Sequence, residues 1–273
     1  VVATLLPFPV DILGLNCATG PDAMRIHLDY LAQSWPGLIA CMPNAGLPQM
    51  KDGHVSYPLG PDAFAAAMDR LAREVGLNVV GGCCGTTPEH IRALRKAVKG
   101  FAAPPRQVQR PEQVSSVFSP IDLSQEPPPL YIGERANATG SKKFRDALLA
   151  DNYDAAFAIL AEQEEVGAHV VDLSCAYAGR DEAKDFQILV ARAGRECRIP
   201  IMVDTTQADV AENALKLYGG RAIINSVNFE SGEERASRVA EMARRYGAAL
   251  VCLTIDETGM AMNAERKTAI AKR

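Results

Sequence analysis

The chain has 273 residues, and its 48% hydrophobic and 23% charged residues are typical of a globular protein with a sizeable core. The net charge of −4 gives no electrostatic support for binding nucleic acid or an anionic membrane. Seven thinly spread cysteines do not form a secreted disulfide framework. We find neither a signal peptide nor an apolar run of about 18 residues. We therefore expect a cytoplasmic protein with no nucleic-acid or membrane partner.

The first hundred residues alternate between short apolar segments and amphipathic segments. The apolar segments predict strands at 11–17, 37–42 and 77–83, and the periodic segments predict helices at 22–33, 62–75 and 89–99. This β-α-β-α-β-α order is the signature of a parallel sheet. Three strands cannot close a barrel by themselves.

Two adjacent thiols, Cys83 and Cys84, follow the third of these strands within a glycine-rich turn, and Cys17 ends the first strand. Carboxyl ends of parallel strands share one rim, where α/β folds collect ligands and metals. Three thiolates there suit a zinc site with an open fourth position. Two alternatives remain open: small buried cysteines, or a strained disulfide between Cys83 and Cys84.

Residues 101–129 have no apolar period and contain a Pro104-Pro105 pair and a Pro127-Pro128-Pro129 run. We predict a semi-rigid linker here, between one domain at 1–100 and another at 130–273. In the second domain the alternation resumes, with strands expected at 130–133, 169–174, 201–205, 222–227 and 249–255. Helices are expected at 153–166, 182–197, 208–218 and 233–246. Five successive βα units favour an eight-fold βα barrel.

Polar side chains follow the strands of this second domain. They are Glu134 to Ser141, Asp172 with Ser174, Asp204 to Thr206, Asn225 to Asn228, and Asp256 with Glu257. Carboxylates and amides on one rim could hydrogen-bond a flat heterocycle such as a pterin. The alternative is that each group caps the helix that follows it, a role these residue types favour.

Three motifs of the first domain resemble the homocysteine-binding barrel of cobalamin-dependent methionine synthases: Gly14-Leu-Asn-Cys17, Cys41-Met-Pro-Asn-Ala-Gly46 and Gly81-Gly-Cys-Cys-Gly-Thr-Thr-Pro88. Betaine–homocysteine methyltransferases share the thiol pattern. The motif Gly133-Glu-Arg-Ala-Asn-Ala-Thr-Gly-Ser141 resembles the opening of the pterin-binding barrel. Only methionine synthases place a homocysteine barrel directly before a pterin barrel. The resemblance implies two (β/α)8 barrels of the TIM type, joined by a proline-rich linker and both truncated in this chain.

The resemblance also implies a set of site residues. Cys17, Cys83 and Cys84 would bind zinc, with the homocysteine thiol as fourth ligand, and Asn16 would help to hold the amino-acid end. The residues against 5-methyltetrahydrofolate would be Glu134, Asn137, Ala138, Thr139, Asp204 and Asn225. Asn225 and Asp204 would orient the folate for methyl transfer to cobalamin, which a separate module of the full-length protein would bind. Cys41 is not a ligand in this pattern.

The sequence departs from the family pattern at Asp172-Leu-Ser174, where Asp-Val-Asn is usual, so the role of Asp172 stays open. Two other functions also stay open. One is a homocysteine S-methyltransferase that uses another methyl donor, and the other is a non-catalytic thiol- or metal-binding protein. Because the chain starts with Val1 and runs into a helical pattern at Arg273, we expect both ends to be cut.

Overall fold

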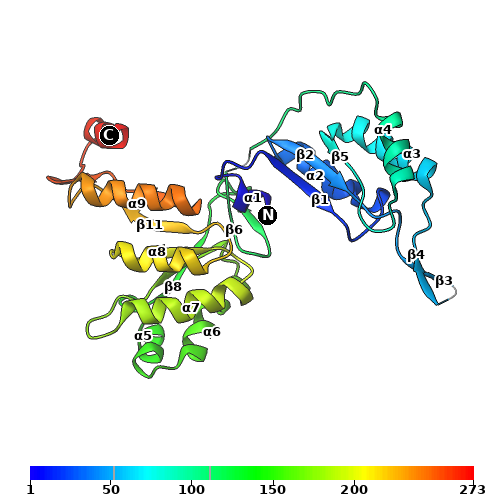
Figure 1. The fold of residues 1–273 in the computed structure, drawn as a ribbon. Helices are drawn as coiled ribbons and strands as arrows, with labels where there is room; N and C mark the ends of the chain where they lie inside the picture. The colour runs from blue at the N-terminus through cyan, green and yellow to red at the C-terminus, as the bar shows by residue number, and fades with distance from the viewer. Residues whose placement is uncertain (52, 111) are drawn as a thin grey trace. The chain divides into compact units, whose positions relative to one another are not determined.

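The computed structural model describes residues 1–51, 53–110 and 112–273, which group into two compact units (Figure 1). The N-terminal unit spans Pro9–Pro111, and the C-terminal unit spans Glu112–Arg273 together with Ala3–Phe8. The division falls inside the segment expected to be a linker. No helix among the described residues is long and apolar enough to cross a membrane.

A three-stranded parallel sheet in the order β1-β2-β5 forms the N-terminal unit. Its strands are β1 (Ile12–Asn16), β2 (Leu38–Met42) and β5 (Val79–Val80). The helical elements between and after them are η1 (Asp22–Met24), α2 (Arg25–Ser34), α3 (Pro61–Leu71), η2 (Ala72–Gly76) and α4 (Pro88–Ala97). The predicted alternation is confirmed. A hairpin of β3 (Gln49–Lys51) and β4 (His54–Ser56) was not predicted, because three-residue strands are too short to show a period.

Local sequence explains where α3 begins and which side it buries. Pro61 occupies the first turn, where its missing N–H costs nothing, and Asp62 follows it near the positive helix end. Phe64, Met68 and Leu71 follow at helical spacing and are almost completely buried. One face of α3 is therefore apolar.

The C-terminal unit is built on a five-stranded parallel sheet in the order β12-β11-β10-β9-β8. Its strands are β8 (Ile132–Asn137), β9 (Val170–Ser174), β10 (Ile201–Asp204), β11 (Ile223–Val227) and β12 (Ala249–Cys252). Its helices are α5 (Lys142–Leu149), α6 (Tyr153–Glu165), α7 (Glu182–Glu196), α8 (Ala208–Leu217), α9 (Glu233–Tyr246) and α10 (Ala264–Lys272), and α1 (Val2–Leu5) starts the chain. A short hairpin pairs β13 (Ile255–Asp256) with β14 (Gly259–Met260). Helices α7, α8 and α9 lie side by side along the sheet (Figure 1). The predicted α/β class is confirmed, and neither parallel sheet closes into a barrel within the described ranges.

Side chains of the five-stranded sheet alternate between two faces, as the strand period of two requires. Val171, Leu173 and Val203 belong to the main core of this unit, which also contains the buried faces of the helices. The opposite, inner face carries Val170, Met202 and Ile223, which form a second small cluster with Val114.

Val114 lies in an additional hairpin within the segment expected to be a linker. Strand β6 (Gln113–Ser115) pairs antiparallel with β7 (Pro120–Asp122), and Val114 is completely buried. Ser115 also exchanges backbone hydrogen bonds with Arg221, at 2.9 and 3.0 Å. Part of this segment is therefore ordered structure of the C-terminal unit, and it covers the apolar end of the inner face.

Candidate functional site

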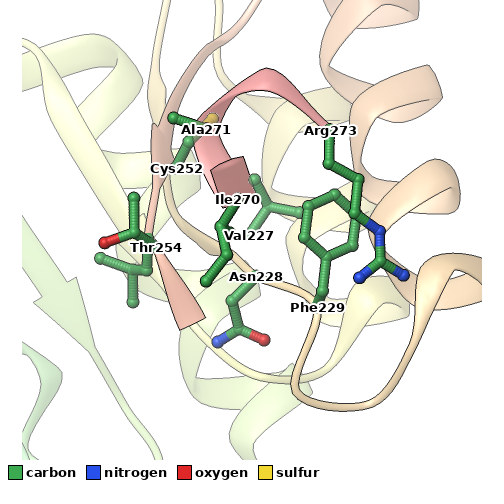
Figure 2. Close-up of a pocket in the computed structure, with 9 residues that line it drawn as sticks. Val227, Asn228, Phe229, Cys252, Thr254, Ile270, Ala271 and Arg273 are labelled. Atoms are coloured by element: carbon green, nitrogen blue, oxygen red, sulfur yellow. The ribbon is translucent and has the colours of Figure 1, made fainter. Parts of the chain in front are cut away.

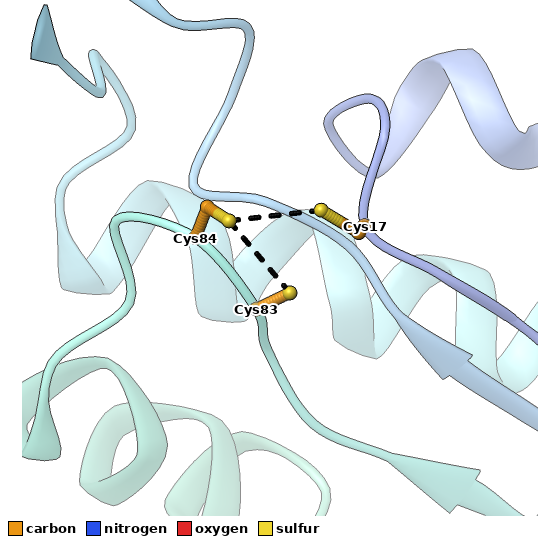
Figure 3. A group of neighbouring side chains, drawn as sticks. All are labelled: Cys17, Cys83 and Cys84. Atoms are coloured by element: carbon orange, nitrogen blue, oxygen red, sulfur yellow. Dashed lines mark hydrogen bonds between the residues drawn. The ribbon is translucent and has the colours of Figure 1, made fainter.

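The structure brings together the three thiols that sequence reasoning singled out (Figure 3). The Sγ atom of Cys84 lies 3.6 Å from that of Cys17 and 3.9 Å from that of Cys83. All three sulfurs lie within 4.8 Å of one another. The cysteines are free, Cys17 and Cys83 are half-buried, and Cys84 is exposed. They therefore form neither a disulfide nor a buried apolar cluster in this structure.

The end of β2 and the segment that follows it hold both thiol-bearing turns. The Cys17 N–H donates to the Met42 carbonyl at 2.9 Å, and the Cys83 N–H donates to the Pro43 carbonyl at 2.8 Å. The Ala45 N–H donates to the Cys84 carbonyl at 2.9 Å. Because β2 is the middle strand, its extension bonds to the ends of both neighbouring strands. This backbone scaffold positions the sulfurs without using any of the thiol groups.

Asn44 adds a side-chain contact to this scaffold and was not identified from the sequence. Its side chain is 3% exposed, and its Oδ1 accepts a hydrogen bond from the Cys84 N–H at 3.1 Å. Its own N–H donates to the Thr19 carbonyl at 2.9 Å. The motif Pro43-Asn44 was visible in the sequence, but nothing local indicated that the amide reaches a residue forty positions away.

Unusual backbone geometry accompanies the thiols. Cys17 and Ala18 have φ values of 65° and 60°, in the left-handed region that L-residues rarely occupy. Gly85 has φ of 78°, and a Cβ there would lie 2.2 Å from the Tyr57 ring. Glycine is therefore needed after Cys84, both for its backbone angle and for the close approach of Tyr57.

Hydrogen bonding shifts the pKa values of Cys17 and Cys83 in opposite directions. The pKa of Cys17 is lowered by a hydrogen bond from the Ala18 backbone, and then by the thiols of Cys84 and Cys83 and by Asn44. The pKa of Cys83 is raised by its hydrogen bond with Cys17, by burial and by Cys84. The surroundings therefore favour the thiolate form at Cys17 and the thiol form at Cys83.

The sulfur geometry fits a zinc ion. Two thiolates bound at about 2.3 Å to a tetrahedral zinc lie about 3.8 Å apart. The spacings of 3.6 and 3.9 Å at Cys84 bracket that value. Cys17, Cys83 and Cys84 could thus hold zinc with one position left for a substrate.

Two other residues near the thiols, Cys41 and Asn16, differ in their exposure to solvent. Cys41 is completely buried on β2, where its Sγ lies 3.8 Å from Met24 Sδ, and burial raises its pKa to about 12. It lies outside the thiol group, as expected from the family pattern. Asn16 is exposed at the end of β1, immediately before Cys17, so its amide is open to solvent.

A second polar cluster lies on the inner face of the C-terminal sheet. Met202 pairs with Asp172, and Asp204 pairs with Asn225, in parallel register. Because Met202 and Asp204 are two residues apart on β10, Asp172, Asp204 and Asn225 share one face. The Asn225 Nδ2 donates to Asp172 Oδ1 at 3.4 Å. Three strands therefore bring two carboxyl groups and one amide together.

The two carboxyl groups of this cluster have raised pKa values. Burial, followed by the nearby Asp204 carboxylate, raises the pKa of Asp172 from 3.8 to about 6, with Glu134 adding to the shift. Burial and the Glu182 carboxylate raise the pKa of Asp204, and a hydrogen bond with Ser174 opposes this. The Asp172 carboxyl can therefore take up a proton at about pH 6, above the range of an ordinary carboxyl, and the cluster offers both donors and acceptors to a ligand.

The expected residues of β8 and of the loop after it have different roles in the structure. Asn137 Oδ1 accepts three hydrogen bonds, from the Thr139 N–H at 2.9 Å, the Thr139 hydroxyl at 2.8 Å and the Gly140 N–H at 2.8 Å. Ala138 is completely buried, and its N–H donates to Ser174 at 2.9 Å. Glu134 is exposed. Asn137 thus shapes the loop with its side-chain oxygen, and its amide N–H groups have no partner among the residues that the structure describes.

Hydrogen bonds also test whether the polar strand ends are only helix or turn caps. Ser141 accepts from the Phe144 N–H, and Asn228 and Asp256 accept from backbone N–H groups two residues further on. Asp172, Asp204 and Asn225 cap no backbone N–H in the part of the chain that the structure describes. Capping therefore explains several of these residues but not the cluster on the inner face.

Glu182 supports the end of β10 and was also missed by sequence reasoning. Its carboxylate is 9% exposed and accepts from the Thr205 hydroxyl at 2.5 Å and from Gln207 Nε2 at 2.6 Å. Thr205 directly follows Asp204. The buried Glu182 carboxylate thus has a hydrogen-bond donor for each of its oxygens, and the two bonds fix the turn that follows Asp204.

A cavity of about 190 Å³ lies beyond β11 and β12, next to α10 (Figure 2). Its lining is mostly apolar and includes Val227, Phe229 and Ile270, with the Arg273 guanidinium 4.4 Å from the Phe229 ring. None of Asp172, Asp204 and Asn225 lines it. The cavity is therefore distinct from the polar cluster.

Comparison with known proteins gives matches to both halves of the chain. The homocysteine S-methyltransferase family matches residues 1–98, and the pterin binding enzyme family matches residues 133–272. Methionine synthase of Mycobacterium tuberculosis is 44% identical over 98% of this chain and 23% of its own length. Methionine synthase of Mycobacterium leprae is 42% identical over 100% of this chain and 23% of its own length. The predicted resemblance is confirmed, and the chain spans about a quarter of the length of these relatives.

A solved structure, Yersinia pestis DHPS with a pterine-sulfa conjugate, is also similar. It is 19% identical, with a TM-score of 0.35, over 53% of this chain and 50% of that chain.

Proposed function

The chain belongs to the family of pterin binding enzymes, and from this premise we propose that it takes part in methyl transfer from 5-methyltetrahydrofolate, through cobalamin, to zinc-bound homocysteine. The products would be methionine and tetrahydrofolate. The observation that carries the proposal is the coexistence of a three-thiol cluster and an inner-face cluster of Asp172, Asp204 and Asn225 in one chain. The order of the two matched families, homocysteine S-methyltransferase before pterin binding enzyme, supports it.

In the N-terminal unit, the proposed zinc ligands are Cys17, Cys83 and Cys84. Bound zinc would lower the pKa of the homocysteine thiol, so that a thiolate is available near neutral pH. The scaffold around the end of β2 and the Asn44 amide hold the ligand-bearing turns through hydrogen bonds that do not use the sulfurs, which would reduce the ordering cost of metal binding. Asn16, exposed beside Cys17, is the proposed contact for the amino-acid end of homocysteine.

In the C-terminal unit, the pterin ring is proposed to bind against the inner-face cluster and the loop after β8. Asp204 and Asn225 would hydrogen-bond the ring and hold its N5 atom in position for protonation and methyl transfer. Glu134, Asn137, Ala138 and Thr139 would border the same site. Because the Asn137 side-chain oxygen, the Ala138 N–H and the Thr139 N–H are already committed, we expect this segment to contribute mainly through the Asn137 amide N–H groups.

The methyl carrier would come from a cobalamin-binding module of the intact protein. The proposed location is the cytoplasm, where thiols such as these stay reduced. If the protein used a methyl donor other than folate, the inner-face cluster would have no folate to bind. Folate binding therefore discriminates between the two candidate functions.

The test separates the two half-reactions in the intact protein. Zinc content, methyl transfer from methylcobalamin to homocysteine, and demethylation of 5-methyltetrahydrofolate by reduced cobalamin are measured side by side. We expect about one zinc per chain and both half-reactions. If the protein methylates homocysteine but does not bind folate, the methyl donor is a different compound and the proposal is wrong on that point. If the protein contains no zinc and shows no methylation, the remaining interpretation is a non-catalytic thiol protein.

A further inference from the structure

One arginine next to the loop proposed to contact folate has no charged partner among the described residues. Arg145, on α5, donates from Nη1 to the carbonyls of Ala138 and Thr139, each at 3.3 Å. Its guanidinium also lies 5.5 Å from the ring centre of Tyr177, in the loop after β9. Arg145 therefore connects the loops that follow two neighbouring strands.

The other edge of this guanidinium is free. Within the described ranges, no carboxylate pairs with Arg145, and neither its Nε nor its Nη2 atom has a hydrogen-bond acceptor. This edge is the fork that binds a carboxylate through two parallel hydrogen bonds. Arg192 is the contrasting case: it lies 4.1 Å from the Phe157 ring, but its nitrogens bond the carboxylates of Asp154 and Glu196.

We propose that Arg145 and Tyr177 form a subsite for the tail of the reduced folate, the part beyond the pterin ring. The inference rests on the proposed function. The folate tail contains an aminobenzoyl ring and a glutamate, and an aromatic surface beside a cationic fork matches these two parts. Tyr177 is 37% exposed, which leaves ring surface available. Because Arg145 bonds to Thr139 directly, the subsite borders the loop proposed for the pterin ring.

Two ligands separate the subsite from the pterin site. One is 5-methyltetrahydrofolate, and the other is a tailless 5-methyltetrahydropterin that keeps the ring and the methyl group. Affinities for both are measured by calorimetry with the intact protein. We expect the wild-type protein to bind the folate more tightly than the tailless pterin.

Variants then assign the difference to individual side chains. Arg145→Gln should weaken folate binding by about tenfold or more, the usual cost of losing hydrogen bonds to a charged group, and leave tailless pterin binding unchanged. Arg145→Lys keeps the positive charge but not the two parallel N–H donors, so it should lose less folate affinity than Arg145→Gln. Tyr177→Ala should weaken folate binding alone. The matched control is Arg192→Gln, which removes an arginine stacked on an aromatic ring elsewhere in the unit and should change neither affinity.

Equal weakening of both ligands by Arg145→Gln would overturn the subsite, because it would mean that Arg145 only shapes the loop. No change for either ligand would overturn it as well. If the wild-type protein binds neither ligand, the proposed function itself is wrong. This result can be distinguished from the two results above, which concern only the Arg145 variant.

Discussion

Asn44 bonds to both thiol-bearing turns: its side-chain oxygen accepts the Cys84 N–H at 3.1 Å, and its backbone N–H donates to the carbonyl of Thr19, two residues beyond Cys17. Both thiol-bearing turns therefore depend on one residue. The Asn44 oxygen also satisfies the backbone N–H of one of the three cysteines.

Replacement of this residue should loosen the metal site without removing a proposed ligand. We expect Asn44→Ala to lower zinc affinity by about 10- to 100-fold, as is typical for residues that orient metal ligands. Asn44→Asp keeps the acceptor oxygen and should lose less. The measurement is zinc retention against a competing chelator. Unchanged zinc retention in Asn44→Ala would show that the scaffold around the end of β2 suffices.

The zinc assignment itself is tested at each thiol. Cys17→Ala, Cys83→Ala and Cys84→Ala should each abolish homocysteine methylation and spare folate binding, because two thiolates cannot hold a stable site with an open position. Cys41→Ala, at a buried thiol outside the cluster, is the matched control and should affect only packing. A Cys84→Ala protein with full zinc and full turnover would refute the assignment.

The pterin assignment is tested at the inner-face cluster. Asp204→Ala and Asn225→Ala should each weaken 5-methyltetrahydrofolate binding or its demethylation by about 1–3 kcal/mol, the cost of an unpaired polar group. Methyl transfer from methylcobalamin to homocysteine should stay intact. Normal folate demethylation in both variants would mean that these side chains have only a structural role.

Asp172 should make stability depend on pH. Its pKa is raised from 3.8 to about 6 by burial and by the Asp204 carboxylate, so the folded state binds the proton more tightly than the unfolded state. Stability should therefore fall as pH rises between these two values and stay lowered above them. Asp172→Asn keeps the acceptor for Asn225 and cannot ionise. We expect it to raise the melting temperature at pH 7.5 and to change it little near pH 4; an equal change at both would contradict the shift.

Open sheet edges should affect the behaviour of the 273-residue chain by itself. Strands β8 and β12 each have a partner on one side only within the described residues, as do β1 and β5. Unpaired edges promote association with other chains. We expect residues 1–273, expressed alone, to aggregate or unfold without a sharp transition and to show no turnover. Size-exclusion chromatography and thermal unfolding check this, and a soluble monomer with one cooperative transition would contradict it.

Much of the architecture was predictable because its signals are local. Apolar runs that end in Gly81-Gly82 or in Asp204-Thr205 mark strand ends, and Thr87-Pro88 marks the start of α4. The three thiols could be assigned to one rim because parallel strands end on the same side. The short hairpins β3-β4 and β6-β7 were not predictable, since their stability comes from pairing and packing rather than from a pattern within three residues.

By itself, the sequence determined the βα succession, the three thiols and the polar residue types at the strand ends. Only the tertiary structure decided which of those polar groups are caps and which meet on the inner face, because a side chain's partners depend on strand register and on contacts between distant residues. Asn44 at Cys84, Glu182 at Thr205 and Asp172 beside Asp204 all join positions on different elements. The raised pKa of Asp172 has the same origin: burial and a neighbouring carboxylate exist only after the strands have paired.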